Sequence, residues 1–181
     1  VDQDEANGNV SKTKILLNKY MNLRSNLRNE SGNDLAKKSN LFKTQITANA
    51  DSVWLPMKGA NPTLEELINY NLLKPEVKGL MDCLYDPDEL KQNLSEGFRA
   101  RPNIGAAAIL STTANEDDIF WSQIYKAIDA ARGGEEVRVF IISSIFGGTG
   151  ASGFPNIARR IRQIQKDKNV SSNFHLGGAL M

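Results

Sequence analysis

The segment that most constrains the fold of this chain covers residues 137–161. Residues 137–146 are mostly β-branched and apolar, as expected of a central strand buried in an α/β sheet. Four glycines then let the backbone turn sharply and approach a ligand closely: Gly147, Gly148, Gly150 and Gly153. Pro155 suits the first turn of a helix, which isoleucines at helical spacing continue. Because a helix N-terminus behind glycines attracts anions, the sequence predicts a phosphate-binding turn.

Known glycine motifs differ in how well they fit this turn. A Walker A loop requires Lys and Ser or Thr where this chain has Phe154 and Pro155, and Phe154 also replaces the last glycine of a nucleophile elbow. A dinucleotide-binding fingerprint fits residues 148–153, so an NAD(P)-binding reductase is an alternative. That motif expects an acidic residue at the end of the next strand, whereas Asp167 precedes the next strand. A tight turn that binds no ligand is the other alternative.

Residues 147–153, Gly-Gly-Thr-Gly-Ala-Ser-Gly, resemble the signature loop of the tubulin/FtsZ superfamily. The similarity continues at Pro155. Residues 99–108 are similar to an upstream loop that opens a helix in FtsZ, and residues 1–9 resemble the end of the family's second strand with its acidic loop. The chain as a whole is most similar to the divergent bacterial tubulin-like proteins.

This resemblance implies an α/β fold, a partial doubly wound parallel sheet with helices on both faces, like the Rossmann-like nucleotide-binding half of the superfamily. Residues 1–181 would form part of that domain, without the family's first glycine-rich loop and its C-terminal activation domain. The expected ligand is GTP, or ATP, with Mg²⁺, and the full-length protein is expected to self-associate into filaments. Hydrolysis is expected only where subunits stack, since the activating carboxylate lies downstream of this chain, so no catalytic residue is assigned.

The residues expected to bind the nucleotide come from three segments. Backbone N–H groups of the glycine-rich segment would hold the phosphates, aided by the hydroxyls of Thr149 and Ser152. Arg101 and Asn103 would reach the terminal phosphate, and the N-terminal acidic loop would approach the base, the sugar or a Mg²⁺ water. The full set is Asp4, Glu5, Asn7, Arg101, Asn103, Gly147, Gly148, Thr149, Gly150, Ala151, Ser152 and Gly153.

Three positions depart from the family pattern. Phe146 replaces the first glycine of the signature, and Ser152 stands where its last glycine usually lies. Arg159 occupies the place of a glutamate that contacts the nucleotide sugar. These differences leave the base open between guanine and adenine. They also keep a third alternative, a non-catalytic scaffold that has lost nucleotide binding.

Composition narrows the remaining classes of function. A formal net charge of +1 gives no reason to expect a nucleic-acid or membrane partner. Cys83 is the single cysteine, which excludes a disulfide framework and suits a reducing cytoplasm. No apolar run is long enough to span a bilayer. The first residues resemble the tail of a strand and the last ones an uncovered strand, so we expect a fragment of a longer cytoplasmic protein.

Local signals predict the other elements. An apolar stripe of Leu16, Tyr20, Leu23 and Leu27 predicts a first helix packed on the core. Thr63 and Glu66 form a capping-box pattern, and paired glycines after residue 131 predict a helix end. Helices are expected over residues 10–28, 63–73, 75–84, 104–110 and 118–131, another helix is expected to open at residue 86, and a strand is expected over 173–181.

Overall fold

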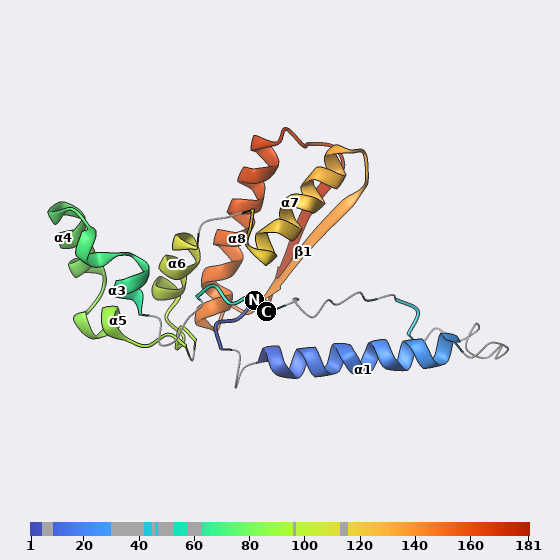
Figure 1. Ribbon diagram of the computed structural model, residues 1–181, viewed down its shortest axis with the longest axis horizontal. Helices are drawn as coiled ribbons and strands as arrows, with labels where there is room; N and C mark the ends of the chain where they lie inside the picture. The colour runs from blue at the N-terminus through green and yellow to red at the C-terminus, as the bar shows by residue number, and fades with distance from the viewer. Residues whose placement is uncertain are drawn as a thin grey trace.

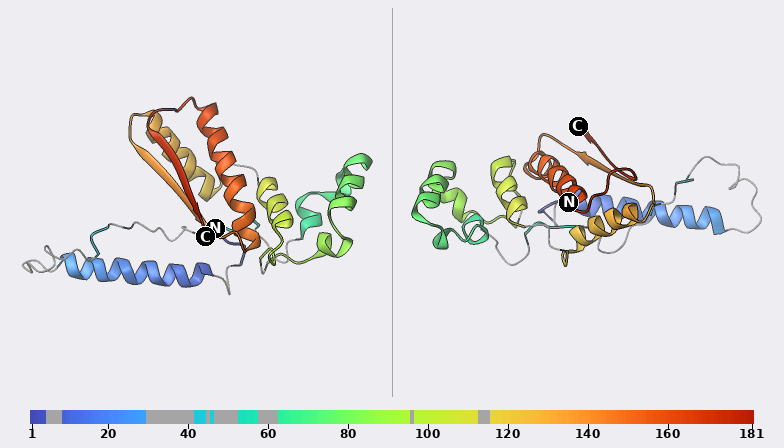
Figure 2. Two further views of the ribbon diagram at one scale, coloured as in Figure 1. Left: turned by 180° about the vertical axis from the view of Figure 1, so that it is seen from behind. Right: turned by 90° about the horizontal axis from the view of Figure 1, so that it is seen from above.

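A computed structural model describes residues 1–4, 9–29, 42–44, 46, 53–57, 63–95, 97–112 and 116–181. The molecule is elongated, with helix α1 (Asn9–Asn29) and helix α4 (Pro75–Leu84) at opposite ends and a small sheet nearer the middle (Figure 1). Both chain ends lie toward the base of this sheet in Figure 1, although the view from above in Figure 2 shows them apart from each other.

The sheet consists of two parallel strands, β1 (Val137–Ser143) and β2 (Phe174–Leu180). Their register pairs Val137 with Phe174 and Ser143 with Leu180. Helix α8 (Gly148–Asp167) connects them, as a parallel pair requires. The predicted order of strand, helix and strand is therefore confirmed, although β1 ends three residues earlier than expected.

One face of the sheet is covered by helices α7 (Ile119–Arg132) and α8, against which Val139, Ile141 and Leu176 pack. The other face is open among the described residues, where Phe140 and Ile142 are each 64% exposed. The prediction of a buried central strand is therefore wrong for this part of the chain. Helices on both faces, as the resemblance implied, are likewise not present among the described residues.

Helix α6 (Pro102–Ser111) packs across the N-terminal half of α8. A β-carbon at Gly153 would lie 3.6 Å from the Cδ1 atoms of both Ile109 and Ile157, an ordinary packing distance. Ile104 and Ala108 of α6 are fully buried. This contact joins the sheet layer to the rest of the molecule.

Residues 63–91 form an arm made of α3 (Leu64–Leu67), the 3₁₀ helix η1 (Tyr70–Leu72), α4 and α5 (Pro87–Lys91). The predicted cap is confirmed, since the Thr63 hydroxyl oxygen accepts from the Glu66 N–H at 3.2 Å. The helix predicted over 63–73 is interrupted, because Asn69 adopts the left-handed backbone with φ 51°. The predictions that Pro75 begins a helix and that Asp86 opens the next one are confirmed.

Helix α1 is confirmed, but its predicted packing on the core is wrong. Leu16, Leu23 and Leu27 are 64%, 49% and 39% exposed. Tyr20 differs from them, because its hydroxyl donates to the Thr44 carbonyl at 2.9 Å.

Candidate functional site

The glycine-rich segment is helical rather than a turn. Helix α8 begins at Gly148, so residues 148–153 form its first turns and Pro155 lies inside the helix, not in its first turn. Glycine is a weak helix former, which is why the sequence favoured a loop. Tertiary packing overrides that preference, since a β-carbon at Gly148 would lie only 2.8 Å from Phe98 Cβ.

The start of α8 lies just beyond the carboxyl end of β1, where the phosphate site was predicted. Gly147 is the N-cap residue, with extended backbone and no side chain to cap the helix. The N–H groups of residues 147–150 have no intrahelical acceptor by geometry, whereas the Ala151 N–H donates to the Gly147 carbonyl at 3.0 Å. The available donors are therefore those of Gly147 to Gly150, and Ala151 is not one of them.

Two of the predicted phosphate ligands have a packing role instead. The Ser152 hydroxyl is 2% exposed and donates to the Gly148 carbonyl, so it points into the helix packing. Gly153 is buried beside Ile109.

Thr149 contacts the N-terminal segment. Its hydroxyl donates to Asp2 Oδ1 at 3.3 Å, and the Asp4 N–H donates to the same oxygen at 3.4 Å. The buried Gln3 amide holds this segment in place by exchanging two hydrogen bonds with the Met57 backbone, of 3.0 and 2.9 Å. Asp2 thus enters the site although the sequence had not assigned it. No local pattern could have found it, because the contact joins residues 147 positions apart.

The N-terminal residues predicted to reach the nucleotide have different outcomes. Asp4 lies beside Gly97, whose β-carbon position is 3.7 Å from Asp4 Cβ. Glu5 and Asn7 lie outside the described residues.

Arg101 reaches the site with its backbone only. Its amide nitrogen lies 3.1 Å from the β-carbon position of Gly148, but its guanidinium pairs with Glu89 at 3.0 Å and with Gln92 at 3.2 Å. Asn103 stands in the first turn of α6, where its carbonyl accepts from the Tyr85 hydroxyl at 3.3 Å. The structure therefore brings the loop before α6 to the start of α8, while the Arg101 side chain turns toward α5.

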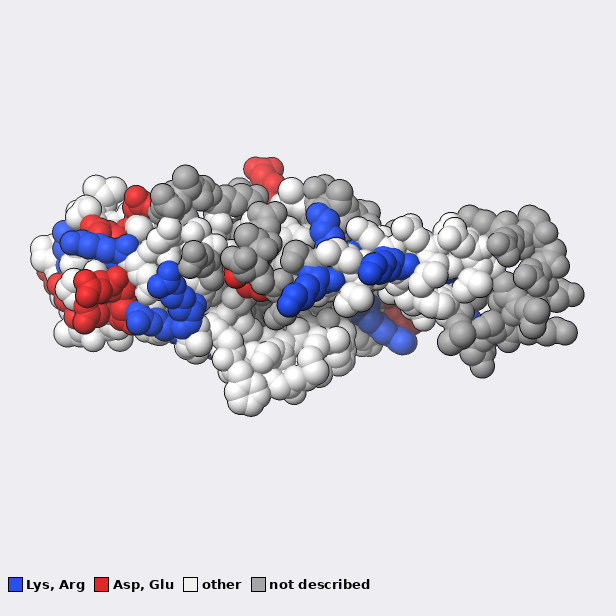
Figure 3. Space-filling view, turned by 90° about the horizontal axis from the view of Figure 1, so that it is seen from below, with Lys and Arg blue, Asp and Glu red and all other residues white. Residues whose placement is uncertain are grey.

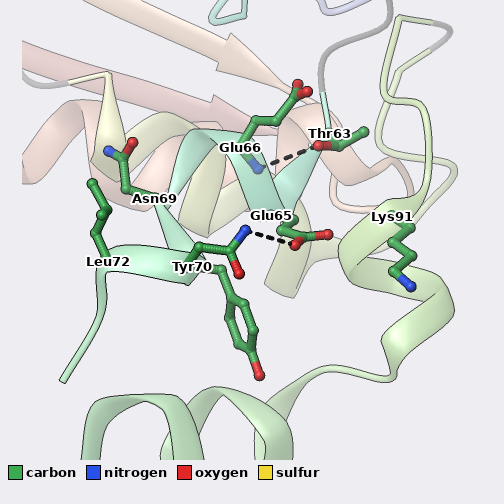
Figure 4. Close-up of a pocket in the computed structure, with 8 residues that line it drawn as sticks. Thr63, Glu65, Glu66, Asn69, Tyr70, Leu72 and Lys91 are labelled. Carbon is green, nitrogen blue, oxygen red and sulfur yellow. Dashed lines mark hydrogen bonds between the residues drawn. The ribbon is translucent and has the colours of Figure 1, made fainter. Parts of the chain in front are cut away.

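A hollow of about 520 Å³ lies elsewhere, in the arm. Figure 4 shows its lining side chains on α3, η1 and α5, with the Asn71 amide donating to Glu65 Oε1 at 3.2 Å. Its lining includes Glu65 and Glu66 together with Lys91. The hollow is open to solvent, and it does not include the start of α8. Within the described ranges, no group of three or more His, Cys, Asp or Glu side chains is arranged to hold a metal ion.

No family model, no curated protein and no solved structure matches this chain. No helix in the described part of the chain has both the length and the apolar character to cross a membrane. The tubulin/FtsZ resemblance therefore rests on the sequence motifs alone.

Proposed function

We propose that this chain is part of the nucleotide-binding domain of a tubulin/FtsZ-like protein and binds a nucleoside triphosphate, GTP or ATP, at the start of α8. The observation that carries the proposal is that start itself. A 20-residue helix begins at Gly148, behind the N-cap residue Gly147, at the carboxyl end of a parallel strand, with no side-chain cap and no acidic residue in its first turn. Unpaired N–H groups and the helix dipole favour phosphate at such a position.

Glycine at position 150 lets the residues after β1 lie close against the first turn of α8. A β-carbon there would lie 2.2 Å from the Ser144 carbonyl oxygen, so no larger residue fits. The N–H groups of Gly148, Thr149 and Gly150 would hold phosphate oxygens, and the Thr149 hydroxyl would add a bond.

Asp2 supports a role for Mg²⁺ in this proposal. Its carboxylate, already bonded to Thr149, would repel a bare phosphate placed at the same helix end. Mg²⁺ is commonly held by one or two carboxylates together with phosphates, and it would remove this repulsion. Binding should therefore require Mg²⁺.

The remaining parts of the proposal follow from the resemblance. The complete domain would have a doubly wound, Rossmann-like sheet, and the full-length protein would form filaments in the cytoplasm. Hydrolysis would occur between stacked subunits, so this chain alone should show negligible turnover.

The test is a fluorescent-nucleotide titration of the chain with GTP, ATP and NADPH analogues, with and without Mg²⁺. Gly147→Ala is the informative variant, because open space surrounds that position and the fold should tolerate a methyl group. The methyl group would occupy the phosphate's place and should weaken binding at least about tenfold. Gly79→Ala, also in open space but in α4, is the matched control and should leave binding unchanged.

Each outcome separates the candidate functions. Submillimolar GTP or ATP binding that weakens in Gly147→Ala supports the proposal and identifies the base. Binding of NADPH alone would assign the chain to the reductase class. No binding of any nucleotide would leave the non-catalytic scaffold.

A further inference from the structure

Helix α1 presents an apolar stripe framed by positive charge. The sequence of α1 contains five Lys and Arg residues and no Asp or Glu. Leu16, Leu23 and Leu27 recur at helical spacing and are exposed, and exposed Lys12 and Lys19 stand four residues before the first two of them. Figure 3 shows blue side chains distributed along this helix between white ones. Such a surface fits a partner that is apolar and rimmed by negative charge.

The arm at the other end of the molecule has the complementary character. Residues 63–91 contain seven Asp and Glu against three Lys. On α4, Val77, Leu80 and Leu84 recur at helical spacing and are 37%, 55% and 55% exposed. Exposed Glu76 stands four residues before Leu80, as Lys19 stands before Leu23. In Figure 3 red side chains gather at this end, over the arm, together with blue ones.

These two surfaces lie at opposite ends of the elongated molecule in all the ribbon views (Figures 1 and 2). In the described arrangement one copy therefore cannot bring them together, whereas two copies can. We propose that the leucine stripe of α1 docks on the α4 stripe of a second copy of this chain, with Lys12 and Lys19 facing acidic residues of the arm.

This contact joins different patches on the two partners, so it leaves one free α1 and one free arm on every pair. Repetition then extends the assembly head to tail, either as an open chain or as a closed ring. The inference names a surface for the proposed self-association, and the contact itself needs no nucleotide. It is therefore tested without nucleotide, so that its failure and the failure of nucleotide binding are separate results.

The single cysteine makes the contact directly measurable. Cys83 is exposed on α4, three residues after Leu80. One copy carries Asn26→Cys on α1 together with Cys83→Ser, and it is mixed with the unmodified chain and a short bis-maleimide. We expect a cross-linked product of two chains. The matched control places the new thiol on α7 instead, with Lys126→Cys and Cys83→Ser, and should give none.

Sedimentation velocity supplies the second measurement. Leu23→Asp changes an exposed residue and so should leave the circular dichroism spectrum unchanged, while weakening self-association at least about tenfold. Lys19→Glu should weaken it less, and adding Glu76→Lys in the same chain should restore it in part, since the reversed pair can attract again. Phe140→Ser changes the open sheet face, which is another candidate surface, and should have no effect.

Several results would overturn the proposal. A chain that stays monomeric, or a mixture that gives no cross-link between the thiol on α1 and Cys83, would show that α1 does not dock on a second copy. Loss of association in Phe140→Ser but not in Leu23→Asp would place the contact on the sheet. Equal cross-linking from the α7 thiol would show random collision.

Discussion

Gly105 controls how closely α6 approaches α8. A β-carbon at this position would lie 2.4 Å from Ser152 Oγ and 2.9 Å from both the Gly148 carbonyl oxygen and Phe98 Cδ2. All three atoms belong to buried residues, and one of them is backbone, so the contact cannot relax by rotating a surface side chain. The absence of a side chain at Gly105 therefore lets α6 pack closely against the start of α8.

Gly105→Ala should consequently destabilise the chain, although alanine favours a helix. Overpacking of this kind costs about 1–3 kcal/mol, which exceeds the gain of about 1 kcal/mol in helix propensity. Urea unfolding should show a lower midpoint for Gly105→Ala. Gly79→Ala, on a helix with open space around it, should be unchanged or more stable. Equal stability of the two variants would mean that the helices do not pack as described.

Tyr70 offers a pH-dependent test of the arm. Its hydroxyl donates to Asp82 Oδ1, and this hydrogen bond is the main reason that the pKa of Tyr70 is raised above its ordinary value of 10.0. Because the protonated phenol is the form that the fold favours, the stabilisation is present below pH 10 and lost as the pH rises through the raised pKa.

Asp82→Ala should lower the pKa of Tyr70, as measured from the difference in absorbance titration between each chain and its Tyr70→Phe derivative. Tyr85, whose pKa is raised mainly by burial, should not respond. An unchanged Tyr70 titration would show that the bond does not form in solution.

Among the elements, α7 contacts Trp54 of the N-terminal part of the chain, and Asp118 serves both this contact and the cap of the helix. Asp118 caps α7 by accepting from the Phe120 and Trp121 N–H groups at 2.9 and 3.3 Å. Its other oxygen accepts from the Trp54 indole at 3.1 Å, and the Trp54 ring stacks on Phe120 at 4.6 Å between centroids. Trp54 is 5% exposed, so its N–H group depends on this acceptor.

Asp118→Ala should therefore cost more than loss of an ordinary cap. A cap contributes about 1 kcal/mol, and an unsatisfied buried donor adds about 1–3 kcal/mol. Asp86→Ala removes an exposed cap on α5 and serves as the matched control. The comparison is made by urea unfolding with tryptophan fluorescence. The indole contribution should disappear in a Trp54→Phe background, leaving Asp118→Ala with the cost of the cap alone. An undiminished cost there would place the whole effect in the cap.

The elements that the sequence predicted correctly are those with signals inside a few residues. Thr63, Asp86 and Pro75 mark helix starts through caps and fixed backbone angles, which act locally. The start of α8 was misplaced because its glycines oppose a helix locally. Contacts that form only in the folded chain explain two of them, Gly148 against Phe98 and Gly150 against the Ser144 carbonyl. The leucine stripe of α1 correctly indicated a helix, but periodicity cannot tell which surface, if any, covers the stripe.

In the candidate site too, some residues could be predicted from local patterns and others only from the tertiary structure. The position of residues 147–150 between a strand and a helix could be predicted, because a glycine-rich segment is a signal within the local sequence. Asp2 could not, and neither could the pairing of Arg101 with Glu89, because both depend on how distant segments fold together.

At the scale of the whole molecule, the candidate site is the place where three segments that lie far apart in the sequence contact one another. The N-terminal segment, the loop before α6 and the start of α8 meet there, whereas the sheet beside them, in the part of the chain that the structure describes, has two strands and one open face. A ligand bound at this meeting point would be bound only by the folded chain. Its binding free energy should therefore add to the stability of the fold.

GTP or ATP with Mg²⁺ should accordingly raise the melting temperature, whereas each component alone should have little effect. At a nucleotide concentration of about 100 times the dissociation constant, the expected gain is about 2.7 kcal/mol.

Differential scanning calorimetry of the chain and of Asp2→Asn makes the test specific. The amide keeps an oxygen for the Thr149 hydroxyl but loses the charge that would favour Mg²⁺. The Asp2→Asn chain should therefore keep its melting temperature without ligand and need more Mg²⁺ to reach the same shift. A nucleotide-dependent shift with the same Mg²⁺ requirement in both chains would exclude Asp2 from the metal's environment, and no shift in either would argue against nucleotide binding at α8.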